Sequence, residues 1–252
     1  MNPEEGIEDS TEITEPTGAI LEILQTMCND ERNAVCVISG RNKDQMEKEF
    51  GHIKNLYIAA ENGYYYGWND MKKPLEFKRL IDVADWRWKS VVNNIIKSYK
   101  ERTDGSLIED EETRVRWYFK DVEAEFARKE ANELVAHLKT MLGNLQLEIM
   151  HHKDYVEIKP IGIDKGSFAK KLLHFIEGTK GTVDLILCIG DNETDERAFK
   201  EVKRYAKARR QREFCITVGQ KVSLADYYLN DQSEVTTLLS EILMTTIKVM
   251  KF

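Results

Sequence analysis

The sequence lacks the features that mark secreted, membrane-spanning or disulfide-stabilised proteins. None of its four cysteines forms a close pair with another, which favours buried, reduced thiols. No apolar run approaches the roughly 20 residues that a membrane-spanning helix needs. The N-terminus has no basic region followed by an apolar core, so we expect no signal peptide. Together these absences predict a cytoplasmic protein.

The sequence also has fewer basic than acidic residues. The chain has 37 Lys and Arg against 44 Asp and Glu, which gives a formal net charge of −7. This balance argues against nucleic acid or an anionic membrane as the main partner. A small anionic substrate remains compatible, because a local pocket can be positive on an acidic protein.

What the sequence does have is enough apolar material for a sizeable core, in two styles of pattern. Its 252 residues are 42% hydrophobic, which allows one large domain or two smaller ones. Strand-like and helix-like segments alternate in residues 1–67 and 161–252, whereas residues 68–160 combine alternating strands with helices. We therefore predict an α/β protein with a Rossmann-like parallel-sheet core in two pieces, interrupted by an inserted α+β cap. Residues 1–16 are acidic and predict a mobile tail or a long loop.

The most informative segment joins an apolar run to a cluster of acids. Residues 185–189 end at Gly190 and suit a strand buried on both faces of a parallel sheet. The acids that follow at once are Asp191, Glu193, Asp195 and Glu196. Acids at such a strand end lie where open α/β sheets bind ligands, and a hard cation such as Mg²⁺ relieves their repulsion. A solvated turn with Thr194 or Asp195 as helix cap is the alternative interpretation.

Two further motifs lie at predicted strand ends or helix starts. Ser39 follows an apolar strand and precedes Gly40 and Arg41, so its hydroxyl and the nearby amides suit a phosphate oxygen. Lys165 opens a predicted helix and offers a point charge to a phosphate. Each motif alone also fits a plain helix cap or a surface lysine. Their order is more specific: a hydroxyl at a strand end, a lysine, and then an acid loop, all on one α/β core.

That order resembles the haloacid-dehalogenase superfamily of phosphatases. Six motifs narrow the resemblance to the trehalose-6-phosphate phosphatase family, which also occurs fused behind trehalose-phosphate synthase domains. The motifs are ISGR, AENG, DGSLIE, VEIKPIGIDKGS, CIGDNETDE and TVGQKVSLADYYL. The similarity runs in order from about Ala19 to Leu243, which is nearly the whole chain, and the combination of motifs is very specific.

The resemblance implies a mechanism and a set of site residues. In such enzymes one aspartate attacks phosphorus and a second, two residues later, protonates the leaving sugar oxygen. Mg²⁺, a hydroxyl and a lysine neutralise the phosphoryl charge. By motif match, the phosphate-binding hydroxyl and lysine would be Ser39 and Lys165, and the metal site would contain Asp191 and Asp195. The positions near the sugar or phosphate would be Arg41, Glu61, Glu109 and Glu157. The insert would be a mobile cap that closes over trehalose 6-phosphate and excludes water.

The sequence departs from this pattern at its first motif. The family's DxDGT at the end of an apolar strand is absent, since the only aspartates before Ser39 are Asp9 and Asp30 and neither has a partner two residues on. The sequence thus lacks the nucleophile, the general acid and the strand that would carry them. Mg²⁺ binding is accordingly expected to be weak or lost.

Other positions differ as well. Glu111 stands where the family usually has lysine, which reverses a charge expected to meet substrate. Asn192 replaces the second acid of the GDD motif, Asn62 replaces the histidine of AEHG, and Lys120 replaces an arginine. These changes favour a degenerate, catalytically inactive phosphatase domain that binds a sugar phosphate or a trehalose-phosphate synthase partner. The alternatives are an active Mg²⁺-dependent phosphatase whose DxDGT lies upstream of Met1, and a related phosphatase with another sugar phosphate.

Overall fold

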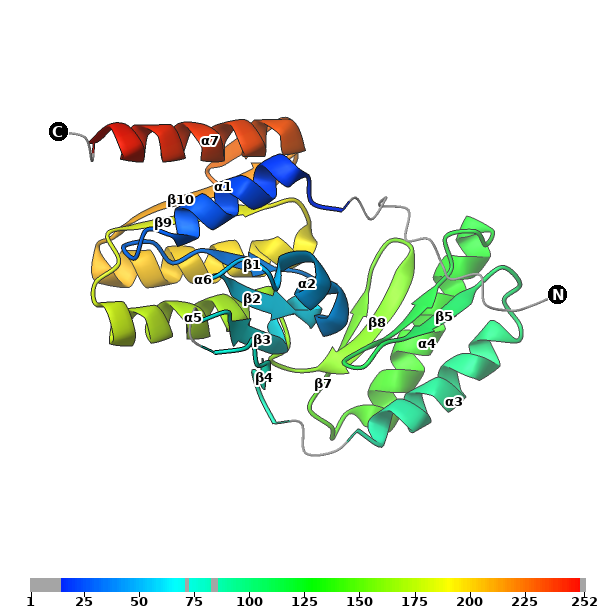
Figure 1. Cartoon of the computed structure of the whole chain (residues 1–252). Coiled ribbons are helices and arrows are strands. Elements are labelled where there is room, and N and C mark those ends of the chain that lie inside the picture. The colour runs from blue at the N-terminus through cyan, green and yellow to red at the C-terminus, as the bar shows by residue number, and fades with distance from the viewer. Residues whose placement is uncertain (1–14, 71–72, 83–85, 250–252) are drawn as a thin grey trace.

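The computed structural model describes residues 15–70, 73–82 and 86–249, arranged around three β-sheets (Figure 1). The predicted N-terminal tail lies almost wholly outside these residues. Two of the sheets and their helices form what we call the core. The third sheet, with its two helices, has a hydrophobic cluster of its own, and we call this part the cap.

The first core sheet combines parallel and antiparallel pairing. Its strand order is β1-β2-β3-β4. β1 (Cys36–Ile38) runs parallel to β2 (Tyr57–Ala60), whereas β3 (Tyr65–Trp68) and β4 (Lys78–Arg79) pair antiparallel. The chain passes from β2 into β3 through the short 3₁₀ turn η1 (Glu61–Gly63). The predicted α/β class is confirmed, with the antiparallel strands placed at one edge.

The second core sheet is parallel throughout. Its order is β11-β10-β9, with β9 (Leu185–Gly190), β10 (Arg212–Val218) and β11 (Tyr227–Leu229). Among the described residues no hydrogen-bonded pairing joins β9 to β1, so the expected single sheet is two separate sheets. β9 is also less covered than its apolar sequence predicts. Ile186 is buried, but Leu185 is 54% exposed and residues 187–190 are half-buried.

Two pairs of helices cover the core sheets from opposite sides (Figure 1). α1 (Gly18–Cys28) contacts α7 (Gln232–Val249), and α5 (Lys165–Lys180) contacts α6 (Glu193–Arg209). α2 (Lys43–Phe50) begins at an Asn–Gln capping box and packs on β2. No helix within the described ranges is both long and apolar enough to cross a lipid bilayer.

The apolar interior of the core is divided into two clusters. One surrounds β2 and includes Phe50 and Ile58, and the other surrounds α6 and includes Phe199 and Cys215. The four cysteines are free. Burial raises the pKa of Cys28 to about 11 and that of Cys215 to about 12, so these thiols stay protonated at neutral pH.

The cap sheet is antiparallel and follows the alternating sequence of the insert. Its order is β5-β6-β8-β7. The strands are β5 (Leu107–Asp110), β6 (Val115–Tyr118), β7 (Leu147–His151) and β8 (Tyr155–Pro160). On β6 the residues alternate between buried and half-buried, because one face meets the cap helices and the other, with Arg116 and Tyr118, faces a cavity.

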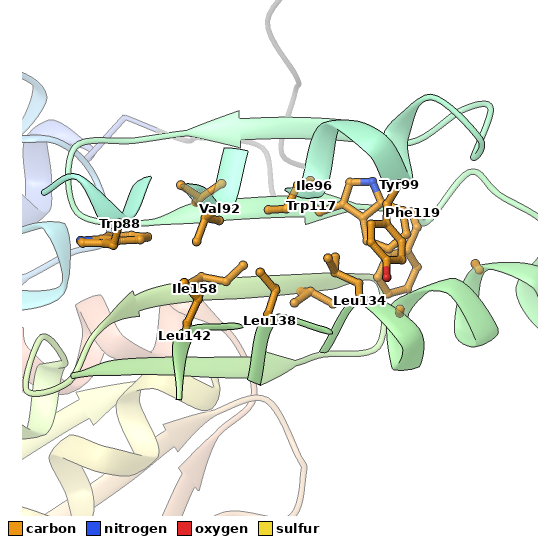
Figure 2. Close-up of a cluster of buried hydrophobic side chains, with 14 residues drawn as sticks. Trp88, Val92, Ile96, Tyr99, Trp117, Phe119, Leu134, Leu138, Leu142 and Ile158 are labelled. Carbon is orange, nitrogen blue, oxygen red and sulfur yellow. The ribbon is translucent and has the colours of Figure 1, made fainter. Parts of the chain in front are cut away.

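The two cap helices cover the buried face of this sheet (Figure 2). α3 (Trp88–Lys100) and α4 (Ala124–Leu142) pack against β6 and β8. Trp117, Leu134 and Leu138 are completely buried between them. The cap therefore has a hydrophobic interior that holds its sheet in place independently of the core.

Truncating one of these side chains should destabilise the cap. We expect Leu138→Ala to lower the free energy of unfolding by about 2–5 kcal/mol, because the lost contacts leave a cavity. Urea titration followed by tryptophan fluorescence measures this. Met141→Ala is the matched control, since Met141 lies on the same helix and is 60% exposed. Equal effects of the two substitutions would contradict the packing described.

Candidate functional site

Loops from the core and strands from the cap enclose one large polar cavity of about 890 Å³. The core contributes the loop after β1, the turn after β2, the start of α5 and the loop after β9. The cap contributes the open faces of β5, β6 and β8. The predicted site residues that line the cavity are Ser39, Arg41, Glu61, Glu109, Glu157, Lys165 and Asp191. Asp195 lies directly behind this wall, bonded to Lys165.

Ser39 sits at the end of β1 with its backbone fully engaged. Its N–H donates to the carbonyl of Ala59 at 2.9 Å, and its carbonyl accepts from the N–H of Asn62 at 2.8 Å. Its hydroxyl oxygen accepts from the N–H of Arg41 at 3.1 Å, which leaves the hydroxyl hydrogen available to an anion in the cavity. The Arg41 side chain forms an ion pair with Glu49 of α2.

The turn after β2 has unusual backbone geometry. Glu61, Asn62 and Gly63 all have positive φ, at 48°, 57° and 100°. Gly63 is required, because a Cβ there would lie 2.4 Å from the Cβ of Phe168. Glu61 is buried and its Oε2 has no partner among the described residues. Desolvation raises the pKa of this carboxyl, although a hydrogen bond from Thr113 opposes the shift.

A buried ion pair connects α5 to the acid loop. Lys165 Nζ lies 2.9 Å from Asp195 Oδ1, and both residues are less than 10% exposed. The other oxygen of Asp195 accepts from the backbone N–H groups of Asp191 and Asn192, each at 3.1 Å. The helix cap is Asn192, not Thr194 or Asp195, and Asp195 completes its capping box. Asp195 thus shapes the loop and holds the lysine at once.

Two glycines let these groups approach. A Cβ on Gly190 would lie 2.3 Å from Asp195 Cγ, and a Cβ on Gly166 would lie 2.5 Å from the carbonyl oxygen of Arg197. At α5, Asp164 caps the helix by accepting from Ser167 N and Oγ, both at 2.9 Å. The glycine and serine of the DKGS motif therefore have structural roles, while Lys165 reaches the cavity wall.

The cap face of the cavity is a network of ion pairs centred on Glu157. Arg116 Nε lies 2.9 Å from Glu157 Oε1 and Lys159 Nζ lies 3.1 Å from Oε2. Arg116 also reaches Glu109 at 3.0 Å and the hydroxyl of Tyr118 at 2.9 Å. Desolvation alone would raise the pKa of Glu157, but the cations Lys159, Arg116 and Arg114 outweigh it and lower that pKa to about 2.

Arg114 is the ion-pair partner of Glu111, the residue whose charge is reversed relative to the family. Arg114 Nη2 donates to Glu111 Oε1 at 2.8 Å, so Glu111 neutralises a neighbouring arginine. The same nitrogen lies 3.4 Å from the carbonyl oxygen of Gly40, which brings the cap against the core loop. The expected repulsion of substrate by Glu111 is therefore offset within the cap.

The sequence arguments missed Arg114, Arg116 and Lys159 as cavity residues. A signal was present, because Arg116 on β6 and Arg114 just before it are two positions apart, and extended chain places such residues on one face. On the neighbouring strand, Glu157 and Lys159 alternate in the same way, and Arg116 is the register partner of Glu157.

Polar contacts also hold the cap against the core elsewhere. Arg197 on α6 forms a two-pronged pair with Glu148 on β7, at 3.0 and 2.6 Å. His152 Nδ1 lies 3.0 Å from Glu193 Oε2. The hydroxyl of Tyr65 on β3 donates to Glu112. These contacts join the cap wall of the cavity to its core wall.

The donor set for a divalent cation is incomplete. Both oxygens of Asp195 are engaged, by Lys165 and by two backbone amides. Asp191 keeps a carboxylate near the cavity, with one contact from Asn192 Nδ2 at 3.4 Å. No group of three metal-ligating side chains occurs within the described part of the chain. Since Mg²⁺ usually takes one or two carboxylates plus phosphate oxygens, these residues do not form a metal site unaided, and Mg²⁺ binding stays a prediction.

Together the α/β core, the antiparallel cap and the enclosed polar cavity define a capped phosphatase-like fold. A family model described as trehalose-phosphatase matches residues 6–233. The chain therefore belongs to the trehalose-phosphatase family.

Relatives and solved structures agree with this assignment. The probable UDP-forming α,α-trehalose-phosphate synthases 7 and 11 of Arabidopsis thaliana are 34% and 36% identical over 90% and 89% of the chain. The chain spans about a quarter of their length, namely 27% and 26%. The trehalose-6-phosphate phosphatase of Aspergillus fumigatus is 26% identical with a TM-score of 0.74, over 93% of this chain and 86% of that structure. The C-terminal domain of the Candida albicans enzyme is 25% identical, also with a TM-score of 0.74, over 91% and 85%.

The buried pair between Lys165 and Asp195 should dominate local stability. We expect Asp195→Ala to lower the free energy of unfolding by about 3–5 kcal/mol, because it leaves a buried lysine without its partner. Chemical denaturation measures the effect. Asp226→Ala is the control, because its pair with Lys203 is half-exposed and should contribute about 0–1 kcal/mol. A cost for Asp195→Ala no larger than the control's would refute the structural role of the pair.

Glu157 should make stability depend on pH. Its folded-state pKa of about 2 lies below the ordinary 4.5, so it stabilises the folded state above about pH 5 and loses this contribution as pH falls toward 2. At pH 7, Glu157→Gln should cost up to about 3 kcal/mol, since each pKa unit corresponds to about 1.4 kcal/mol. The gap between variant and parent should narrow on acidification. Denaturation curves from pH 7 to pH 3, with exposed Glu101→Gln as baseline, test this, and a pH-independent gap would contradict it.

Proposed function

We propose that this chain is a sugar-phosphate-binding domain of trehalose metabolism without phosphatase activity of its own. The observation that carries the proposal is a cavity whose polar groups suit a phosphate while most of its carboxylates are held by other partners. Family membership gives the substrate class, and trehalose 6-phosphate is the ligand we assign. A sugar phosphate can enter between the two walls of the cavity.

Several groups that line the cavity have hydrogen-bond donors left for an anion. Ser39 has a hydroxyl hydrogen directed by no described partner, and Lys165 has one described acceptor for its three donors. On the cap, Arg116 and Lys159 face the same space. A phosphate held among these groups would gain charge-assisted hydrogen bonds, and the sugar hydroxyls would meet Glu109, Tyr118 and Glu157.

Most of the other acids that line the cavity are held by partners of their own. Phosphoryl transfer through a covalent intermediate needs a free carboxylate aimed at phosphorus. Glu109, Glu111 and Glu157 are held by arginines, and Asp164 caps a helix. Glu61 is buried, and desolvation raises its pKa, so burial disfavours its ionised form. Residues 1–252 contain no pair of aspartates two positions apart.

The relatives suggest a regulatory role, because in them the matching region is part of a longer protein named as a synthase. The matched Arabidopsis proteins are named as trehalose-phosphate synthases, and this chain spans about a quarter of their length. We therefore propose a trehalose-phosphate synthase domain or subunit as the partner. Binding of the phosphorylated product would then report its concentration to the synthase.

Binding without turnover is the direct test. Calorimetry should detect trehalose 6-phosphate but not trehalose, and a phosphate-release assay with Mg²⁺ should stay at background. We expect Ser39→Ala to weaken trehalose 6-phosphate binding about tenfold, the effect of losing one hydrogen bond to a charged group. Ser98→Ala, at an exposed serine of α3, should leave it unchanged.

The results separate this proposal from an active enzyme. Phosphate release that depends on Mg²⁺ and falls in Ser39→Ala would establish a trehalose-6-phosphate phosphatase and overturn the inactive assignment. Binding of another sugar phosphate in preference would point to a related substrate. No binding by any sugar phosphate would refute the proposal outright.

A further inference from the structure

Arg114 brings a positive charge of the cap against the core loop that carries Ser39. Its Nη2 atom lies 3.4 Å from the carbonyl oxygen of Gly40, the residue that follows Ser39. A Cβ on Gly40 would lie 3.8 Å from both terminal nitrogens of the Arg114 guanidinium. Arg114 is buried, and both it and Ser39 line the cavity. The guanidinium is therefore placed to contact an anion that Ser39 binds.

A carboxylate already holds this guanidinium in the way that a phosphate would. Arg114 Nη2 donates to Glu111 Oε1 at 2.8 Å, and Arg114 Nε forms a second contact with Glu111 Oε2. Carboxylates and phosphates both accept two hydrogen bonds from the planar fork of an arginine. Glu111 thus occupies the donors that a phosphate beside Ser39 would use.

Glu111 is the partner that can leave this pair. Its side chain is 30% exposed, whereas that of Arg114 is 7% exposed. Glu111 lies in the connection between β5 and β6, where its backbone N–H donates to the carbonyl of Arg114 at 3.0 Å. The backbone is thereby fixed, while the carboxylate can turn toward solvent by a change of side-chain rotamer.

A second acid stays beside Arg114 when Glu111 turns away. Glu157 Oε1 lies 3.7 Å from Arg114 Nη1, and the Glu157 side chain is 4% exposed. Glu157 is itself held in place by Arg116 and Lys159. Exchange of Glu111 for a phosphate therefore does not leave a buried charge unpaired, which is the costly outcome for a buried arginine.

We infer that Arg114 binds the phosphate of the ligand together with Ser39, and that Glu111 is an internal competitor that occupies Arg114 until the phosphate displaces it. The identity of the ligand rests on the function proposed above. A phosphate group on a ligand carries a charge of about −1.5 to −2 at neutral pH, more than the single charge of the carboxylate that it replaces. A neutral sugar cannot displace Glu111, so the pair makes binding depend on the phosphoryl group.

Calorimetry of the whole chain with trehalose 6-phosphate tests the exchange. Glu111→Gln removes the competing charge but keeps the shape of the side chain, so it should tighten binding about tenfold. Arg114→Met removes the guanidinium and should weaken binding about tenfold or more. Once Arg114→Met is present, adding Glu111→Gln should not change the affinity, because the group for which the two anions compete is gone.

Two further variants serve as controls. Asp110→Asn removes the same charge from the residue next to Glu111, but Asp110 pairs with Lys89 and Asn93 and its side chain is 43% exposed. It should therefore change the affinity by less than about twofold. Arg114→Lys keeps the positive charge without the fork. If Arg114→Met does not fold, the gain from Glu111→Gln should be smaller with Arg114→Lys than in the parent.

The outcomes separate this inference from the proposed function. Binding by the parent with no gain from Glu111→Gln would overturn the inference and leave the proposed function standing. An equal gain from Asp110→Asn, or an undiminished gain with Arg114→Met, would also overturn it, since the effect would then be one of overall charge. Binding by Glu111→Gln but not by the parent would support the competition and contradict the proposed function. No binding by either protein would refute both.

Discussion

The buried contact between Lys165 and Asp195 is the interaction on which the geometry of the cavity depends. One carboxylate fixes the first residue of α5, the loop after β9 and the first turn of α6. Buried charged groups are costly unless they are paired. A shift of any of these three elements would therefore leave the Lys165 ammonium or the Asp195 carboxylate buried without its partner. The close approaches at Gly190 and Gly166 leave no room for a different arrangement. The rear wall of the cavity is thus rigid.

The opposite wall is organised by charge balance. Glu157 is shared by Arg116 and Lys159, and Arg114 is shared by Glu111 and Glu157. Arg114, Arg116 and Lys159 each already have a carboxylate partner, so an incoming phosphate must compete for them. Under the function that we propose, the sugar hydroxyls would offset part of this competition, and a sugar phosphate that contacts both walls would bind better than inorganic phosphate.

The sequence was sufficient for the class of fold and for most of the cavity. Apolar runs ending in Ser39 and Asp191 predicted strand ends correctly, because a turn residue after a buried run is a local signal. The division of the core into two sheets could not be predicted, since strand pairing depends on contacts between distant segments. The roles of Glu111 and Asp195 were missed for a related reason. Each is set by a cation that only the folded chain brings near, Arg114 in one case and Lys165 in the other.

Retention of the family's motifs is weak evidence of catalysis, because several motif residues stabilise the fold. Asp195, Gly190, Asp164 and Ser167 are needed for the fold of the loop and the start of α5. Only groups without a structural task can reveal which chemistry persists. The Ser39 hydroxyl hydrogen and the Asp191 carboxylate are such groups, and the nearby Asp195 carboxylate is engaged by Lys165 and two backbone amides. A hydroxyl can bind an anion alone, whereas phosphoryl transfer needs several groups acting together, and this difference supports the binding role that we propose.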